Sequence, residues 1–94
     1  MPHKIVLSDT AIDFLRTIDE KSKLICKKNL EKLSSPYPGK GIGDKEKINV
    51  AGVEMFRLHI GRTYTAFYII DEKAKIVRIL EIISIEAAHK KYGF

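Results

Sequence analysis

The segment 55-MFRLHIGRTYTAFYII-70 decides the fold of this chain of 94 residues. Apolar and polar residues alternate on both sides of a turn at Gly61-Arg62-Thr63. Successive side chains of a strand point to opposite faces, so Phe56, Leu58 and Ile60 share one face. The pattern therefore predicts two antiparallel strands joined by a short turn, with this aliphatic and aromatic face turned towards the core.

The residues after this hairpin extend the predicted sheet. Asp71-Glu72-Lys73 predicts a second turn, and residues 76–85 predict a longer final strand. The three strands form an antiparallel meander, which residues 86–94 follow as a short helical or irregular tail.

The residues before the hairpin predict one more strand and two helices. Residues 4–7 are β-branched and aliphatic, and Ser8 or Thr10 is placed to cap a helix. A second helix is expected to begin at Asp19 and to end near residue 33, forming an antiparallel helical hairpin with the first. An apolar stripe with helical spacing marks the first helix: Ala11, Phe14, Leu15 and Ile18.

These elements predict a single α+β domain over residues 1–94 with the order β-α-α-β-β-β. The helical hairpin should pack on one face of a small antiparallel sheet, which leaves a basic open face. Residues 34–43 read as a loop, and the run 39-GKGIG-43 matches neither the phosphate-binding loop nor the dinucleotide fingerprint.

Composition narrows the function classes. A net charge of +5 favours phosphate-bearing or acidic partners, although surface solvation gives the same balance. The lone Cys26 is expected in the core and fits a reducing compartment. The sequence shows no apolar run that suits a membrane helix and no secretory signal, so we expect a cytoplasmic protein. Its histidines and its cysteine lack the spacing of a metal site, so we expect neither a metal nor a cofactor.

Two groups of residues could carry chemistry. Arg57 and His59 should point together to the open sheet face, where a cation can grip a phosphate and an imidazole can move a proton. A solvated outer face is the competing interpretation. The tail adds His89, Lys90, Lys91 and Tyr92. These tail residues are a strong candidate for the site only if the tail folds back onto the face that holds Arg57 and His59.

The chain resembles the RelE/ParE family of toxins from toxin–antitoxin systems. The resemblance lies in the element order and in 56-FRLHIG-61 followed by 64-YTAFY-68, which match an aromatic, basic and aliphatic alternation, a turn and a pair of tyrosines. It extends into 70-IDEK-73, 79-ILEI-82 and 88-AHKKYG-93 and covers most of the chain.

The resemblance implies RNA cleavage in the ribosomal A site for RelE-like members, in which a ribose 2′-hydroxyl attacks the adjacent phosphate. It places Arg57 and His59 at the two basic strand positions and Tyr92 or His89 at the C-terminal position. The chain departs from the pattern at Thr65, where the family has arginine.

A second departure is the neutral run 83-ISI-85, where the family has a basic residue after the last strand. Arg62 could substitute for the first missing cation and Lys90 or Lys91 for the second. The loop residues Lys40, Lys45 and Lys47 would add sequence-independent affinity for the RNA backbone.

Three functions follow from this resemblance. The first is a ribosome-dependent mRNA endoribonuclease that works without a metal. The second is a non-enzymatic, ParE-like toxin that binds gyrase, and the third is a catalytically weakened member that binds its antitoxin. Under all three, the partner is an acidic or amphipathic antitoxin that could form a hetero-oligomer with the chain; the first adds the ribosome and mRNA.

Overall fold

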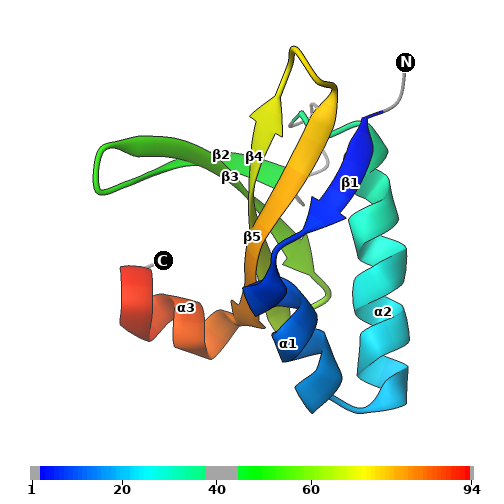
Figure 1. Cartoon of the computed structure of the whole chain (residues 1–94). Helices are drawn as coiled ribbons and strands as arrows, with labels where there is room; N and C mark the ends of the chain where they lie inside the picture. The colour runs from blue at the N-terminus through cyan, green and yellow to red at the C-terminus, as the bar shows by residue number, and fades with distance from the viewer. Residues whose placement is uncertain (1–2, 38–44, 94) are drawn as a thin grey trace.

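The computed structural model describes residues 3–37 and 45–93 and contains a five-stranded sheet with helices on both faces. Its strands are β1 (Lys4–Leu7), β2 (Lys45–Val50), β3 (Val53–Ile60), β4 (Tyr64–Asp71) and β5 (Ile76–Ser84). They lie in the order β1-β5-β4-β3-β2 (Figure 1). Strands β3, β4 and β5 form the predicted antiparallel meander, β2 adds a further antiparallel strand, and β1 joins β5 in parallel, so the sheet is mixed.

Strand β2 was not predicted from the sequence, which placed Lys45 and Lys47 in a loop. It lies at the sheet edge and pairs only with β3, so a strand as charged as 45-KEKINV-50 is tolerated there. Ala51 and Gly52 join the two strands with positive φ angles of 52° and 84°, the backbone conformation of a tight hairpin turn. Lys40 and the run 39–43 lie outside the described residues.

The predicted helices are confirmed. Helix α1 (Asp9–Thr17) begins after Ser8, whose hydroxyl accepts a hydrogen bond from the backbone N–H of Ala11. Helix α2 (Glu20–Leu30) begins after Asp19, whose carboxylate accepts a bond from the N–H of Ser22. A short 3₁₀ helix, Glu31–Ser34, completes the segment that the sequence assigned to the second helix.

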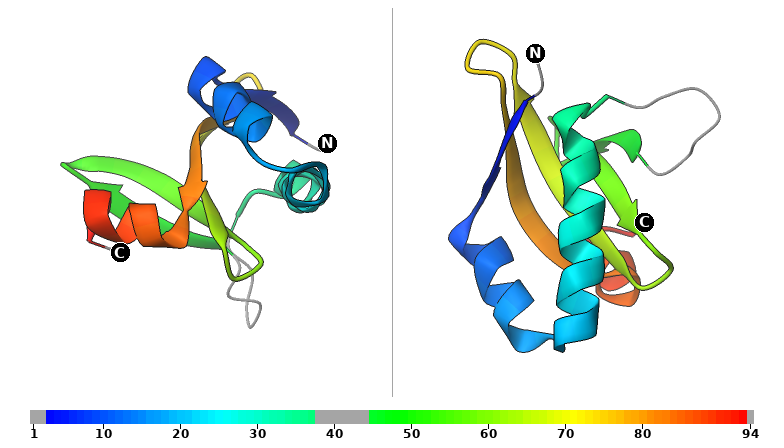
Figure 2. Two further views of the ribbon diagram at one scale, coloured as in Figure 1. Left: turned by 90° about the horizontal axis from the view of Figure 1, so that it is seen from below. Right: turned by 90° about the vertical axis from the view of Figure 1, so that its right-hand side faces the viewer.

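Helices α1 and α2 cover one face of the sheet, as Figure 2 shows, and bury the main core between them. The alternation in β3 has the predicted register, since Leu58 and Ile60 are buried beneath the helices. Cys26 is fully buried there, which confirms its structural place, and burial raises the pKa of its thiol.

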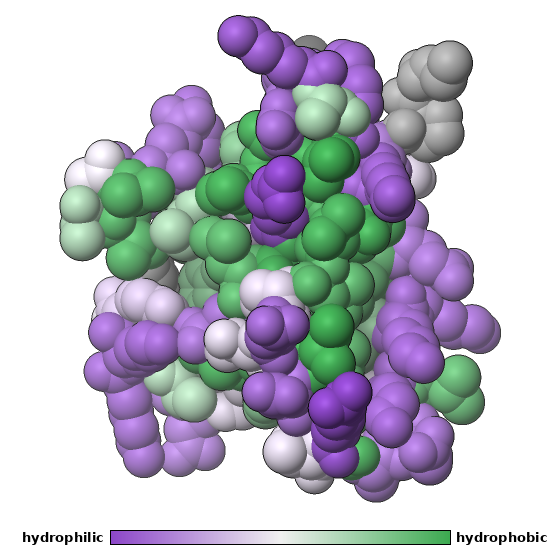
Figure 3. Space-filling model, viewed as in Figure 1, coloured by the Kyte–Doolittle hydropathy of each residue, from purple (hydrophilic) through white to green (hydrophobic). Residues whose placement is uncertain are grey.

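The opposite face is not fully open, because helix α3 (Ile85–Tyr92) packs on it (Figure 2). Ser84 caps this helix, and Gly93 ends it with a φ of 78°. The second apolar cluster is made of Ile48, Phe67 and Ala88, with Val50, Met55, Ile83 and Tyr92 packed against it. In the view of Figure 3, apolar residues gather in the middle of the molecule and hydrophilic residues surround them.

No helix among the described residues has both the length and the apolar character that crossing a bilayer requires.

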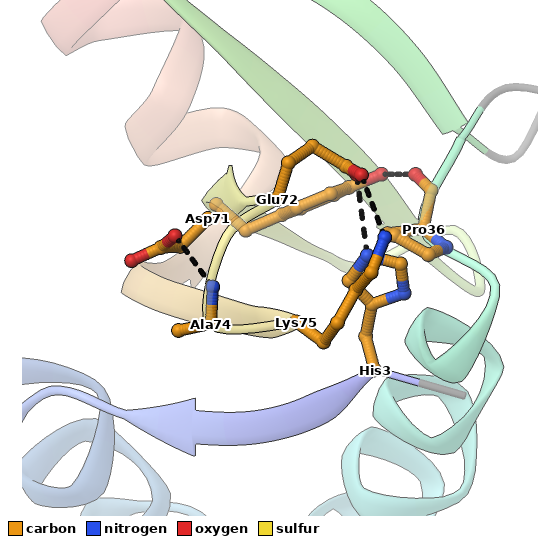
Figure 4. A network of polar contacts seen from close by, with 7 residues as sticks. His3, Pro36, Asp71, Glu72, Ala74 and Lys75 are labelled. Atoms are coloured by element: carbon orange, nitrogen blue, oxygen red, sulfur yellow. Dashed lines mark hydrogen bonds and ion pairs between the residues drawn. The ribbon is translucent and has the colours of Figure 1, made fainter. Parts of the chain in front are cut away.

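One buried hydrogen bond ties the chain after α2 to the sheet. The hydroxyl of Tyr68, a fully buried side chain of β4, donates to the backbone carbonyl of Pro36 at 2.6 Å. Figure 4 shows this carbonyl beside the β4–β5 turn.

We expect Tyr68→Phe to lower the free energy of unfolding by about 1–3 kcal/mol, because the carbonyl of Pro36 loses a buried donor. Urea denaturation measures the change. Tyr37→Phe is the control, since the hydroxyl of this half-exposed side chain has no hydrogen bond in the part of the chain that the structure describes. Equal stabilities of the two variants would show that the hydrogen bond from Tyr68 to Pro36 does not stabilise the fold.

Candidate functional site

A pocket of about 600 Å³ lies where the β3–β4 turn meets the start of α3. The backbone N–H of Ile85 donates to the carbonyl of Thr63 at 2.8 Å, which fixes the first turn of α3 against this hairpin turn. The lining residues are Arg62, Thr63, Ser84, Ile85, Glu86, His89 and Lys90. The pocket therefore brings together three of the basic residues that the sequence predicted for the site.

Positive charge dominates the pocket. Arg62 is exposed and forms no ion pair within residues 3–37 and 45–93. The Nζ atom of Lys90 lies 3.8 Å from a carboxylate oxygen of Glu86, and both side chains are at least four-fifths exposed, so this pair is weak. With His89 beside them, the two cations suit a phosphate group and a proton transfer at the same place.

A second group of side chains crosses the sheet on the side that α3 covers. Glu46 of β2, Arg57 of β3, Phe67 of β4 and Glu81 of β5 are direct neighbours in register. Arg57 lies on the predicted face, but its side chain is only 14% exposed and forms an ion pair with Glu46. Its charge is thus already balanced inside the protein.

Glu81 holds the end of α3. One carboxylate oxygen accepts a hydrogen bond from the hydroxyl of Tyr92 at 2.8 Å, and the other accepts one from Nζ of Lys91, also at 2.8 Å. The ring of Tyr92 meets Phe67 edge-on, with the centroids 4.9 Å apart. Burial, and then the bond to Glu81, raise the pKa of Tyr92, and the same carboxylate raises the pKa of Lys91.

Comparison with known proteins identifies the fold. No protein-family model and no curated protein sequence matches the chain. Among solved structures, the toxin–antitoxin complex RelBE2 from Mycobacterium tuberculosis has a chain with a TM-score of 0.73 and 19% identity, and the match covers 89% of this chain and 99% of that one.

Two further structures agree. The archaeal RelE–RelB complex from Pyrococcus horikoshii OT3 gives a TM-score of 0.70 at 16% identity, covering 89% of this chain and 96% of that one. The YoeB dimer from Staphylococcus aureus gives 0.64 at 18% identity, covering 86% and 94%. The chain has a RelE-like fold. The resemblance found in the sequence is therefore confirmed at the level of the fold.

Within this RelE-like fold, His59 lies apart from the pocket. It is half-buried on the α3 side of β3, directly opposite Thr65 of β4, and it is absent from the pocket lining. Thr65 is only 1% exposed, and its hydroxyl donates to the carbonyl of Leu58 at 3.2 Å. An arginine at position 65 would have to bury its charge here, so the departure from the family pattern is built into the packing.

The two lysines of β2 point away from this site. Lys45 and Lys47 face the helical hairpin side, because Ile48 and Glu46 occupy the alternate positions on the α3 side. Nζ of Lys45 donates to the carbonyl of Ser35 at 2.9 Å, and Nζ of Lys47 lies 3.3 Å from Glu54. Lys45 and Lys47 therefore lie on the other side of the sheet from Arg57, and their role in binding the RNA backbone stays a prediction.

The acidic partners Glu46 and Glu81 are the residues that sequence reasoning missed. The sequence shows both carboxylates, but only the register of four strands places them beside Arg57 and Tyr92. No cluster of three metal-ligating side chains occurs within the described ranges.

The contacts of Tyr92 predict how stability depends on pH. Because the folded state raises its pKa above the ordinary value of about 10, the folded chain holds the phenol proton more tightly than the unfolded chain. This contribution is complete below pH 10 and is lost as the pH rises through the higher folded pKa. We expect the free energy of unfolding to fall above pH 10, and less steeply in Tyr92→Phe. Urea denaturation between pH 8 and 11 measures both slopes, and identical slopes would contradict the prediction.

Proposed function

We propose that this chain is the toxin of a toxin–antitoxin pair and that it cleaves RNA by attack of a ribose 2′-hydroxyl on the adjacent phosphate. The observation that carries the proposal is the pocket in which Arg62, His89 and Lys90 meet. The RelE-like fold supports it, since the similar chains come from complexes named as RelE–RelB and as toxin–antitoxin RelBE2.

The pocket residues have distinct roles in this reaction. Arg62 and Lys90 hold the oxygens of the scissile phosphate, and they stabilise the charge that builds up as the 2′-oxygen bonds to phosphorus. The bond from phosphorus to the 5′-oxygen then breaks, which leaves a cyclic 2′,3′-phosphate and a 5′-hydroxyl. His89 gives a proton to the leaving 5′-oxygen, which contributes about 100–10,000-fold in rate, and water takes the proton of the 2′-hydroxyl.

The proposed substrate is mRNA bound to the ribosome, and the proposed partner is an acidic or amphipathic antitoxin that forms a hetero-oligomer with the chain. The net charge of +5 supports both, because each carries negative charge. A ParE-like toxin that binds gyrase needs no proton-transfer residue, so the histidine in the pocket disfavours that alternative.

A catalytically weakened toxin that binds its antitoxin is the second candidate. Two observations favour it. The ion pair with Glu46 neutralises Arg57, and the buried Thr65 stands where the family resembled in sequence has an arginine. Losing one donor to a developing negative charge can cost on the order of 100–1000-fold in rate.

We expect His89→Ala to reduce message cleavage by at least about 100-fold while ribosome binding stays intact, because only proton transfer is lost. Arg62→Ala should reduce both, since a phosphate contact acts in the ground state and in the transition state. In vitro translation followed by primer extension on the message measures cleavage. Arg16→Ala, on the exposed face of α1, is the control. A wild-type chain that leaves the message uncut favours the weakened toxin.

RNA affinity should fall as salt rises. For single-stranded RNA the slope of log affinity against log salt is about −0.7 for each phosphate contacted. Removing Arg62 should therefore make the slope shallower by about 0.7, and Arg16→Ala should leave it unchanged. Fluorescence anisotropy with a labelled oligoribonucleotide gives the slopes. The titrations run from about 50 to 200 mM salt, the range over which phosphate contacts change the affinity strongly. Equal slopes for wild type and Arg62→Ala would exclude Arg62 as a phosphate contact.

A further inference from the structure

We propose that the part of the sheet face that α3 leaves uncovered is a docking surface for an acidic, amphipathic helix of a partner protein. Arg78 lies in the middle of this surface and pairs with a carboxylate of the partner helix. The inference rests on the proposed function in one respect, because the antitoxin proposed there is a partner of this kind. It adds where that partner binds and which residue recognises it.

The strand register places a row of side chains across this surface. Arg78 of β5 is the partner of Val6 of β1 and of Ile69 of β4. All three lie on the α3 side of the sheet, because the residues before and after each of them pack in the core beneath α1 and α2. Val6, Arg78 and Leu80 also line a hollow of about 310 Å³ between β1 and β5. The surface is therefore aliphatic, with one cation at its centre.

The aliphatic side chains of this surface belong to neither core. Val6, Ile69 and Leu80 are half-buried, and all three are absent from the two clusters of packed apolar residues. In the view of Figure 3, apolar residues gather over β5, the strand that carries Arg78. Apolar residues that lie together at the surface mark a site of contact with another molecule.

Helix α3 covers only one end of this face. It packs over Ile48 and Phe67, and it follows directly from the C-terminal end of β5, whereas Arg78 lies near the start of that strand. On the opposite face, α1 and α2 together provide the cover. The row across β1, β5 and β4 spans about 10 Å at the usual strand spacing, which is about two turns of an α-helix. A short helix beside α3 would complete the cover of this face.

Charge complementarity defines the chemistry of the partner. Arg78 is exposed and forms no ion pair or hydrogen bond within the described part of the chain. Asp9 lines the same hollow without pairing with it, and Glu81 of the same strand already accepts two hydrogen bonds from α3. A guanidinium among aliphatic side chains loses its water when an apolar partner covers it. The partner must therefore bring a carboxylate to this point, which a guanidinium binds through two hydrogen bonds.

Two other occupants fit this surface less well. A second copy of this chain, in a twofold contact centred here, would set one Arg78 against the other, and like charges oppose such a contact. Proteins that bind single-stranded RNA stack its bases on aromatic side chains and track its backbone with several cations. The residues that surround Arg78 are aliphatic instead, so the surface suits the apolar face of a helix.

The probes for the experiment are two synthetic amphipathic peptides of about 14 residues, each held in a helix by a side-chain lactam. Both carry leucines along one face, and the residue in the middle of that face is glutamate in one peptide and lysine in the other. We expect the full chain to bind the glutamate peptide about 10–100-fold more tightly, because only a carboxylate pairs with Arg78. Isothermal titration calorimetry measures the affinities. Amide chemical shifts of Val6, Ile69 and Arg78 in NMR spectra locate the bound peptide.

Arg78→Glu should reverse the preference. We expect it to weaken binding of the glutamate peptide by at least about 100-fold and to let the lysine peptide bind in its place, a rescue that a structural role of Arg78 would not give. Arg16→Glu is the matched control, because it makes the same change of charge at an exposed residue of α1 that lines a different apolar pocket. It should leave both affinities unchanged. Melting temperatures report whether each variant is folded.

Several results would overturn the proposal. The first is a wild-type chain that binds neither peptide at about 1 mM, the weak limit of specific binding. The second is equal binding of both peptides, or a loss in Arg16→Glu in place of Arg78→Glu.

A dimer of the wild type that Arg78→Glu dissociates would assign the surface to a second copy, and analytical ultracentrifugation detects it. An oligoribonucleotide whose binding is lost in Arg78→Glu but kept in Arg16→Glu would assign the surface to RNA. Either result also overturns the proposal. The peptide assays involve no cleavage of RNA, so their failure leaves the proposed function standing, and that function is decided by message cleavage.

Discussion

The alternation of side chains in β3 and β4 is the constraint on which the rest of the structure depends. It turns Leu58, Ile60 and Tyr68 to one side, where α1 and α2 bury them, and it turns Arg57 and Phe67 to the other. A shift by one residue would exchange the two sets and leave neither face able to pack. Because both faces are apolar at their centres, both need a helical cover, and α3 provides the second one.

That second cover changes the chemistry of the sheet face. On the α3 side of the sheet, polar side chains have partners within the protein: Arg57 pairs with Glu46, and Lys91 and Tyr92 both bond to Glu81. Within the described part of the chain, Arg62 has no acidic partner, and it borders the pocket at the start of α3. The candidate site therefore lies at the junction of the β3–β4 turn and α3, whereas the family resemblance implied a site in the middle of the sheet.

The sequence predicted what depends on local rules. The cap of the first helix, the start of the second helix at Asp19 and the register of residues 56–60 follow from side-chain chemistry and strand periodicity. The structure confirms them and selects Ser8 over Thr10 as the cap. Strand β2 was not predicted, because a strand at the sheet edge needs few apolar residues and so lacks the alternating pattern. The pairs formed by Glu46 and Glu81 were not predicted, because they depend on which strands are neighbours in the sheet. Local sequence patterns do not show that order.

The parallel pairing of β1 with β5 has a consequence for how the molecule assembles. Lys4 is the register partner of Ile76, although most of the chain separates them. Strand β1 can therefore join the sheet only after β5, the last strand in the chain, has been made. Pairings of such long sequence separation form slowly, because the loop must close before the contact stabilises it. Helix α3 follows β5 in the chain, so His89 and Tyr92 are synthesised after all five strands. A nascent chain is thus without its candidate site until β5 and α3 have both been synthesised.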